Sequence, residues 1–339
     1  MSVANTFSDN IDKLKKLDSL LKNSGFYTYS LKSTGEKFCF DLLAKRDDML
    51  FVIKILSNID NISEDIFEEM KFFSKIVNAI PILIGEKNRR TILDDLTIYV
   101  RKRLPIINFN TFRSMIKDNI FPYIVAKRGG GAIFLDGNQL KLLREEKEIS
   151  RKNFAEHIGI TKRSLCSYER GVMRTSVDTA KKIEEILDNS IFRKINLYKW
   201  NFQIDFEEFL EQDVEKTEFD ELIEGILKDI GFSTFWSKKN MNPYDLFITS
   251  KDFEPNEKVD SFFPVCSSIN EKAQKINELK LKNLLRISKI LDKIYLHIVD
   301  NSFRSPSIPR KKLPIVRLRD LEKIDDIDRF KNFVKDMKN

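Results

Sequence analysis

Hydrophobic residues recur along the chain with two different periods, which predict an alternation of helices and strands. In the first third, the apolar runs FVIKIL from Phe51 and PILIG from Pro81 are separated by an amphipathic stretch, Glu64–Val77. Continuous runs rich in Val and Ile are typical of central strands covered on both faces, whereas apolar residues every three or four positions indicate a helix. The first third of the chain therefore predicts an α/β unit.

The middle of the chain, residues 139–171, predicts three short helices in succession. Ser150 and Thr161 each stand where a hydroxyl group can accept a free backbone N–H and cap the helix that comes next. Gly159 lies between them and suits the left-handed residue that ends a helix. We expect a further helix, Ser176–Leu187, directly after these three.

This segment resembles the helix-turn-helix of the phage-repressor and Cro superfamily, through its ending YERG at residues 168–171. The resemblance implies that the third helix enters the DNA major groove with its first residues facing base edges. It also implies a structural ion pair between Arg144 and Glu169. The DNA-binding residues that it implies are Arg151, at the start of the second helix, and Lys162, Arg163, Ser164, Ser167 and Arg170.

A three-helix scaffold that binds only protein is the alternative for this segment. Residues 139–200 hold 14 Lys or Arg against 9 Asp or Glu, a net charge of +5. A basic helical surface favours a nucleic-acid partner, so we expect DNA binding.

A long self-similarity relates the two ends of the chain. The segment LKNSGFYTYSLKSTGEKFCFDLLAK aligns with LKDIGFSTFWSKKNMNPYDLFITSK. Gly25 corresponds to Gly231, 206 residues later, and Asp41 corresponds to Asp245, 204 residues later. Each segment, together with the residues after it, predicts the order α-β-β-β-α-β-β-α. We expect one fold in two copies, although any two α/β units share helix and strand periodicity.

The order of elements in the repeat resembles the PD-(D/E)xK nuclease superfamily, which includes archaeal Holliday-junction resolvases. That chemistry needs two carboxylates and a lysine around Mg²⁺. In the first copy Asp41 and Lys54 match the pattern, but Val52 stands where the second carboxylate belongs. In the second copy Asp245 remains, and FFPVC offers neither Glu nor Lys. We therefore expect no catalysis and no metal site in either copy.

Alternatives remain open for the first copy. A glutamate of the next helix, Glu64, Glu68 or Glu69, could supply the missing ligand, as in some members of that superfamily. We favour the simpler interpretation that all three form the solvated face of an amphipathic helix. Asp41 could equally be structural, capping a turn or pairing with Lys54, and we favour this over metal binding.

The expected fold class is α/β plus all-α, with a central helix-turn-helix domain flanked by two repeated nuclease-like α/β domains. The expected domains are a degenerate nuclease-like copy at 1–125, the helix-turn-helix domain at 132–190, a connector at 191–216 and a second copy at 217–335. This order, together with the stretch FDLLAKRDDMLFVIKILSNID, resembles a family of archaeal helix-turn-helix proteins described as transcriptional regulators.

Charge and the reactive residues refine this picture only slightly. The chain has 339 residues and a formal net charge of +7, which favours a polyanionic partner. Basic clusters at 87–90, 101–103 and 310–312 could add phosphate contacts or could be solvated loops.

Cysteine and histidine are too few and too scattered to suggest a zinc site. We expect Cys39 and Cys266 at core positions on strands and Cys166 on the recognition helix, in a reduced cytosol. Of the two histidines, His157 is expected at the solvent edge of a helix and His297 in an apolar strand. Neither a signal peptide nor a membrane helix is evident, and no cofactor motif is found.

The sequence thus predicts a cytoplasmic, sequence-specific DNA-binding transcription regulator. It would use the recognition helix 162–170 on double-stranded DNA, as a homodimer, and would not be an enzyme. The first rival is a Mg²⁺-dependent DNA nuclease using Asp41, Lys54 and a glutamate of the helix 64–77. The second is an antitoxin-like module that acts through a protein partner. A second carboxylate near Asp41 and Lys54 would favour the first rival, and a large apolar patch on the outer domains would favour the second.

Overall fold

The computed structural model describes residues 3–31, 38–128, 130–202, 214–238, 241–250, 265–270, 278–293, 295–303 and 315–337. The chain forms two compact units. Unit 1 comprises residues 1–54, 63–81 and 203–339, and unit 2 comprises residues 55–62 and 82–202. Strands β3 (Met49–Asn58) and β4 (Ile80–Lys87) contribute residues to both units.

The first part of unit 1 is an antiparallel sheet with two helices. Its elements are α1 (Val3–Asn23), β1 (Tyr27–Ser30), β2 (Leu42–Arg46), the first residues of β3, and α2 (Glu64–Ile76). Strand β2 pairs antiparallel with both β1 and β3. The rings of Phe40 and Phe73 are stacked with centroids 4.9 Å apart, so α2 packs against the segment that leads into β2.

The second part of unit 1 is a sheet in the order β10-β11-β12-β13-β14. Its elements are α9 (Glu218–Ile230), β10 (Phe232–Trp236), β11 (Leu246–Ser250), β12 (Val265–Asn270), α10 (Glu278–Leu291), β13 (Tyr295–Val299), β14 (Ile315–Arg317), α11 (Leu318–Leu321) and α12 (Ile327–Asp336). In β13, Leu296 and Ile298 pack in the core with α9, whereas Val299 packs with Leu281 of α10. Since side chains alternate across a strand, the two helices cover opposite faces of this sheet.

The strands of the N-terminal and C-terminal segments have matching pairings. Strands β10, β11 and β12 pair antiparallel in that order, as β1, β2 and β3 do. Strand β13 pairs parallel with β14, and β4 pairs parallel with β6. The second part has the predicted element order, with α12 added at its end. Residues 1–125, expected as the first copy, contain one more strand than predicted, β5 (Thr97–Arg101), which belongs to unit 2 and which sequence periodicity did not reveal.

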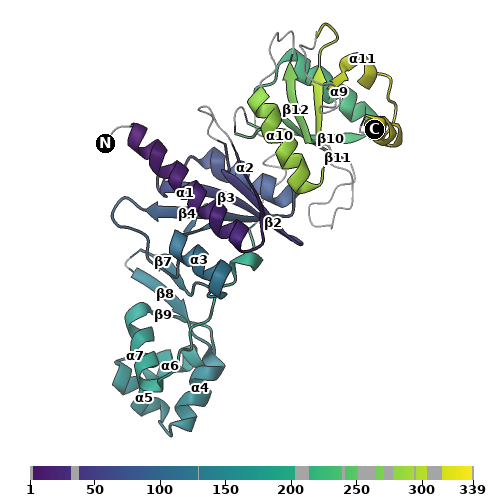
Figure 1. Cartoon of the computed structure of the whole chain (residues 1–339). Helices are drawn as coiled ribbons and strands as arrows, with labels where there is room; N and C mark the ends of the chain where they lie inside the picture. The colour runs from purple at the N-terminus through teal and green to yellow at the C-terminus, as the bar shows by residue number, and fades with distance from the viewer. Residues whose placement is uncertain are drawn as a thin grey trace. The chain divides into compact units, whose positions relative to one another are not determined.

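Unit 2 carries a sheet that continues into the helix-turn-helix segment. Its strands have the order β4-β6-β5-β7-β8-β9, and its helices α4 to α7 gather beyond β9 in Figure 1. Besides the end of β4, its elements are β5 (Thr97–Arg101), β6 (Leu104–Ile107), α3 (Phe109–Asp118), β7 (Ile124–Lys127), β8 (Gly130–Phe134), α4 (Gly137–Glu146), α5 (Arg151–Ile158), α6 (Lys162–Glu169), β9 (Arg174–Ser176), α7 (Val177–Leu187) and the 3₁₀ turn η1 (Leu197–Lys199).

Two expectations about this architecture need correction. The helix-turn-helix segment is not purely helical, because β8 pairs antiparallel with β7 and β9 and ties the helices to the sheet. Cys39 does not lie on a strand but in a bend before β2, where it is fully buried. Cys166 lies on α6, and His297 is buried on β13, as expected. The basic cluster at 310–312 lies outside the described residues.

Candidate nucleic-acid interface

The helices α4 to α7 each begin at a residue whose side chain accepts a backbone N–H. Ser150 Oγ accepts from Asn153 N at 3.1 Å, and Thr161 Oγ1 accepts from Ser164 N at 3.0 Å. The capping side chain is Asp136 for α4 and Ser176 for α7. Each cap satisfies a donor that the first turn of a helix leaves without a partner, so it fixes where that helix starts. Ser150 and Thr161 have the capping role that the sequence predicted.

Close packing of α4 against the end of α6 fixes the angle of the motif. A Cβ atom built at Gly137 would lie 2.2 Å from Glu169 O and 2.5 Å from Tyr168 O. Only glycine therefore fits at the first residue of α4 without moving the backbone of α6. The core beneath the helices is apolar and contains fully buried Phe154 and Leu165.

A buried carboxylate joins three helices of the motif. Glu169 of α6 accepts from Arg144 Nε of α4 at 2.7 Å and from Arg151 Nε of α5 at 2.6 Å. The side chains of Arg144 and Glu169 are 5% and 3% exposed. Arg144 also donates from Nη1 to Ile149 O at 2.8 Å. The Glu169 carboxylate thus orients α4, α5 and α6 relative to one another. Its hydrogen bonds are strong because both partners are charged and water is excluded from the site.

Arg151 therefore has a partner within the protein, which the sequence did not suggest. Its hydrogen bond to Glu169 raises the pKa of the Arg151 guanidinium, yet 40% of its side chain stays exposed. The expected position of Arg151 at the start of α5 holds, with Nε engaged by Glu169.

The solvent face of α6 carries the predicted DNA-binding side chains. Lys162 and Arg163 are exposed in the first turn, and Arg170 is exposed at the C-terminal end. The two serines are half-buried and bonded locally: Ser164 Oγ to Thr161 Oγ1 at 2.9 Å, and Ser167 Oγ to Arg163 O at 3.1 Å. The helix therefore presents basic groups at its N-terminal end, and its hydroxyls are held close to the backbone.

The nuclease-like pattern of the first copy is present as an ion pair. Lys54 Nζ lies 2.8 Å from Asp41 Oδ1 and donates to Phe38 O at 2.6 Å. Val52, two residues before Lys54 on β3, is fully buried. In the C-terminal segment Asp245 forms an ion pair with Lys280 of α10. Each aspartate thus faces a lysine, as the structural interpretation of Asp41 predicted.

Glu69 does not belong to the solvated face of α2, which corrects our expectation for this residue. It is 1% exposed, on the same side of the helix as Phe73, four residues later. Its carboxylate accepts from Lys238 N and from Asn242 Nδ2, both at 2.7 Å. The spacing was a usable signal, because positions four apart share one helix face.

The surroundings of Glu69 shift several pKa values. Burial raises the pKa of Glu69 to about 7, although its hydrogen bonds with Lys238, Ser237 and Asn242 oppose this rise. Cys39 is fully buried, and burial raises the pKa of its thiol; the charges of Glu69 and Asp41 add to this rise, while Lys54 opposes it. Glu69 is thus a second carboxylate in the neighbourhood of Asp41 and Lys54, and it is bound to the segment after β10.

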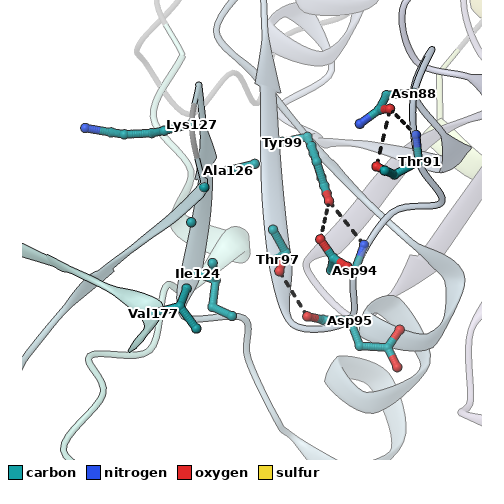
Figure 2. Close-up of a pocket in the computed structure, with 12 residues that line it drawn as sticks. Asn88, Thr91, Asp94, Asp95, Thr97, Tyr99, Ile124, Ala126, Lys127 and Val177 are labelled. Carbon is teal, nitrogen blue, oxygen red and sulfur yellow. Dashed lines mark hydrogen bonds between the residues drawn. The ribbon is translucent and has the colours of Figure 1, made fainter. Parts of the chain in front are cut away.

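A cavity of about 310 Å³ lies in unit 2 between the segment 88–99 and the strands β7 and β8. Figure 2 shows Tyr99 donating to Asp94, at 2.9 Å, and Thr97 donating to the backbone of Asp95, at 3.0 Å. The polar groups that line this cavity are largely bonded to one another.

Within the described residues, no cluster of three or more His, Cys, Asp or Glu could hold a metal ion, and no helix is long and apolar enough to cross a membrane.

Comparison with known proteins finds matches for both the N-terminal nuclease-like segment and the helix-turn-helix segment. Residues 10–122 match a PD-(D/E)XK superfamily domain, and residues 140–192 match a helix-turn-helix family. A relative from Methanocaldococcus jannaschii, described as a "Putative HTH-type transcriptional regulatory protein", is 31% identical over 88% of this chain and 91% of its own length.

Two further matches were found. A relative with the same description from Methanobrevibacter smithii is 29% identical over 96% of this chain and 97% of its own length. A crystal structure of SinR, the master regulator for biofilm formation, in complex with DNA covers 16% of this chain and 90% of the SinR chain, with 34% identity and a TM-score of 0.15.

Proposed function

Because the chain belongs to the family of archaeal HTH-type transcriptional regulatory proteins, we propose that it binds double-stranded DNA in a sequence-specific manner through α6. The observation that carries this proposal is the exposed Lys162-Arg163 pair at the start of a helix held by a cap, a glycine contact and a buried ion pair. A rigid helix can place such side chains against base edges in the major groove.

The proposed roles divide the exposed residues of the motif. Lys162, Arg163, Ser164 and Ser167 face the bases, and Arg170 faces the backbone at the other end of α6. Arg151 contacts the DNA backbone only through the part of its guanidinium that Glu169 leaves exposed. Its main role is then to hold α5 against α6.

Selection of bound fragments from a random duplex library, and then footprinting, tests this function. Arg163→Ala is expected to relax the preference for the selected site and to weaken specific binding by about 1–3 kcal/mol. Lys181→Ala, an exposed lysine on α7, is the control and should leave both properties unchanged. An Arg163→Ala protein as selective as the wild type would contradict the assignment of α6.

The protein acts as a two-fold homodimer in this proposal. One helix-turn-helix unit contacts few base pairs, and proteins of this kind bind two half-sites about one helical turn apart. Sedimentation of the free protein and of its complex with the selected site measures the stoichiometry. One chain per palindromic site would refute the dimer.

The two nuclease-like parts share one fold and are not catalytic in this proposal. The matching strand pairings of the two sheets support a common fold. The pairing of Lys54 with Asp41, and the bonds of Glu69 to Lys238 and Asn242, support the absence of catalysis. Incubation with supercoiled, branched and single-stranded DNA and Mg²⁺ or Mn²⁺ is the test. Cleavage that disappears in Asp41→Ala and Lys54→Ala would make the protein a nuclease.

A further inference from the structure

The exposed surface of α6 carries hydrogen-bond donors and no carboxylate or amide group. Its exposed side chains are Lys162 and Arg163 in the first turn and Arg170 at the far end. The helix contains no Asn, Gln or Asp, and its one acidic residue, Glu169, is buried and bonded within the protein. Lysine and arginine donate hydrogen bonds but accept none. Apart from its two serines, α6 can therefore read a base only through acceptors on that base.

The two serines of α6 add little discrimination between bases. Ser164 Oγ lies 2.9 Å from Thr161 Oγ1, and Ser167 Oγ donates to Arg163 O at 3.1 Å. A hydroxyl group bonded in this way can still accept a hydrogen bond, but one hydroxyl contact suits donors and acceptors of any base. The choice of base at the start of α6 therefore depends on the two cations.

Lys162 and Arg163 stand where the helix itself disfavours them. Thr161 caps α6, so the positive end of the helix dipole lies at the first turn, and this turn holds no acidic residue. Cations are unfavourable at that end of a helix. Within the part of the chain that the structure describes, no hydrogen bond or ion pair of either side chain offsets this. A local preference broken without compensation inside the protein is typical of a functional position.

Guanine is the base whose major-groove edge suits two such donors. It presents two acceptors there, N7 and O6, and no donor. Adenine presents one acceptor beside a donor, cytosine presents a donor, and thymine presents one acceptor beside a methyl group. The planar guanidinium of Arg163 can donate to N7 and O6 of one guanine at the same time, and the Lys162 ammonium can contact the same pair of acceptors.

We propose that each half-site bound by α6 contains two guanines, one read by Arg163 and the other by Lys162. This rests on the proposed function of the helix-turn-helix and adds the chemical identity of the bases. Neighbouring Cα atoms are about 3.8 Å apart and successive base pairs about 3.4 Å apart, so the two guanines should lie within about two base-pair steps of each other. Acceptor side chains such as Asn153 and Glu156 lie on α5, the helix that crosses the DNA backbone in this motif.

Duplexes with modified guanines test this proposal without changing the protein. Sites are first selected from a random library, and each conserved guanine is then replaced by 7-deazaguanine, which lacks the N7 acceptor but still pairs with cytosine. Inosine, which lacks only the minor-groove amino group, is the matched control. We expect 7-deazaguanine to weaken binding about five- to tenfold at each of the two positions, because N7 is half of a bidentate contact. Inosine should leave binding unchanged.

Two variants of Arg163 link one of these guanines to its side chain. In Arg163→Ala, 7-deazaguanine should cause no further loss at the guanine read by Arg163 and should keep its full effect at the other guanine. In Arg163→Gln, the side chain offers one donor and one acceptor, so the preferred base at that position should change from guanine to adenine. Both substitutions remove a cation from the first turn of α6, so neither should lower the melting temperature. Lys181→Ala, exposed on α7, is the charge-matched control and should respond to both modified bases as the wild type does.

The outcomes separate this inference from the function on which it rests. Selected half-sites without guanine, or equal losses from 7-deazaguanine in the wild type and in Arg163→Ala, would refute the guanine assignment and leave sequence-specific binding in place. If no 7-deazaguanine weakens binding while Arg163→Ala lowers the affinity for all duplexes equally, Arg163 contacts phosphate and the proposal is wrong. Absence of any selected consensus for the wild type would refute the function of α6 itself.

Discussion

The buried Glu69 carboxyl should make the stability of unit 1 depend on pH between about 5 and 8. Its pKa rises from 4.5 in the unfolded chain to about 7 in the folded one, chiefly because burial disfavours the charged form. A group with a raised folded pKa gives its full stabilisation below the unfolded pKa and loses it as pH rises through the folded pKa. A pKa difference of one unit corresponds to about 1.4 kcal/mol. The free energy of unfolding of unit 1 should therefore fall by about 2–3 kcal/mol from pH 5 to pH 8.

Acid pH reverses the trend, which gives the prediction a second check. Ion pairs with Lys216 and Lys228 lower the pKa of Glu224 in the same unit, although burial, its largest single influence, opposes them. A carboxyl with a lowered folded pKa stabilises above its unfolded pKa, and this contribution disappears as pH falls below about 4.5. Unit 1 should therefore be most stable near pH 5.

The chain offers a local reporter for this measurement. It has two tryptophans, Trp200 in unit 2 and Trp236 next to the segment that binds Glu69. In a Trp200→Phe background, urea unfolding monitored by fluorescence reports the transition around Trp236. Glu69→Gln should remove most of the pH dependence between 5 and 8. Glu68→Gln, one residue earlier and partly exposed, should retain it. Equal pH dependence in the Glu69→Gln and Glu68→Gln proteins would refute the argument.

Two further predictions concern the packing of helices. Glu169→Gln leaves Arg144 and Arg151 without their carboxylate partner. Because removing one partner of a buried ion pair costs about 3–5 kcal/mol, the melting temperature of unit 2 should fall markedly. An unchanged melting temperature would contradict the structural role of this pair. Gly137→Ala should lower the free energy of unfolding by about 1–3 kcal/mol, because its methyl group clashes with α6. Gly225→Ala, inside α9 with open space around it, should raise the free energy of unfolding by about 0.5–1 kcal/mol. Equal effects of the two substitutions would show that α4 does not approach α6 closely.

Local signals explain why the helix-turn-helix was largely predictable. A cap such as Thr161 and a left-handed end such as Gly159, with φ 75°, act within four residues of sequence, so the pattern contains the whole cause. The bond of Arg151 to Glu169 was missed for a different reason. It depends on how α5 and α6 pack in three dimensions, which no local pattern of residues determines.

Nonlocal pairing explains what the sequence did not predict. Strands β5, β7, β8 and β9 have three to five residues each, too few for a clear period of two. They are strands because neighbouring strands pair with them, and no short window of sequence records that. Glu69 is the extreme case, since its partner Lys238 lies 169 residues away.

The bonds of Glu69 also bear on how a nuclease-like fold can serve a regulator. A carboxylate that ligates Mg²⁺ must be charged and must turn its oxygens toward the ion. Glu69 instead turns both oxygens toward Lys238 N and Asn242 Nδ2, and burial favours its neutral form. Releasing it would leave the Lys238 N–H without this acceptor, at about 1–3 kcal/mol, and would leave Asn242 Nδ2 with Ser237 Oγ as its acceptor. Metal binding at Asp41 and the contact of Glu69 with the segment after β10 would therefore oppose each other. We infer that Glu69 holds the segment after β10 in place. Val52 at the neighbouring ligand position is consistent with this inference, because with Glu69 engaged in this way Mg²⁺ has no second carboxylate ligand beside Asp41.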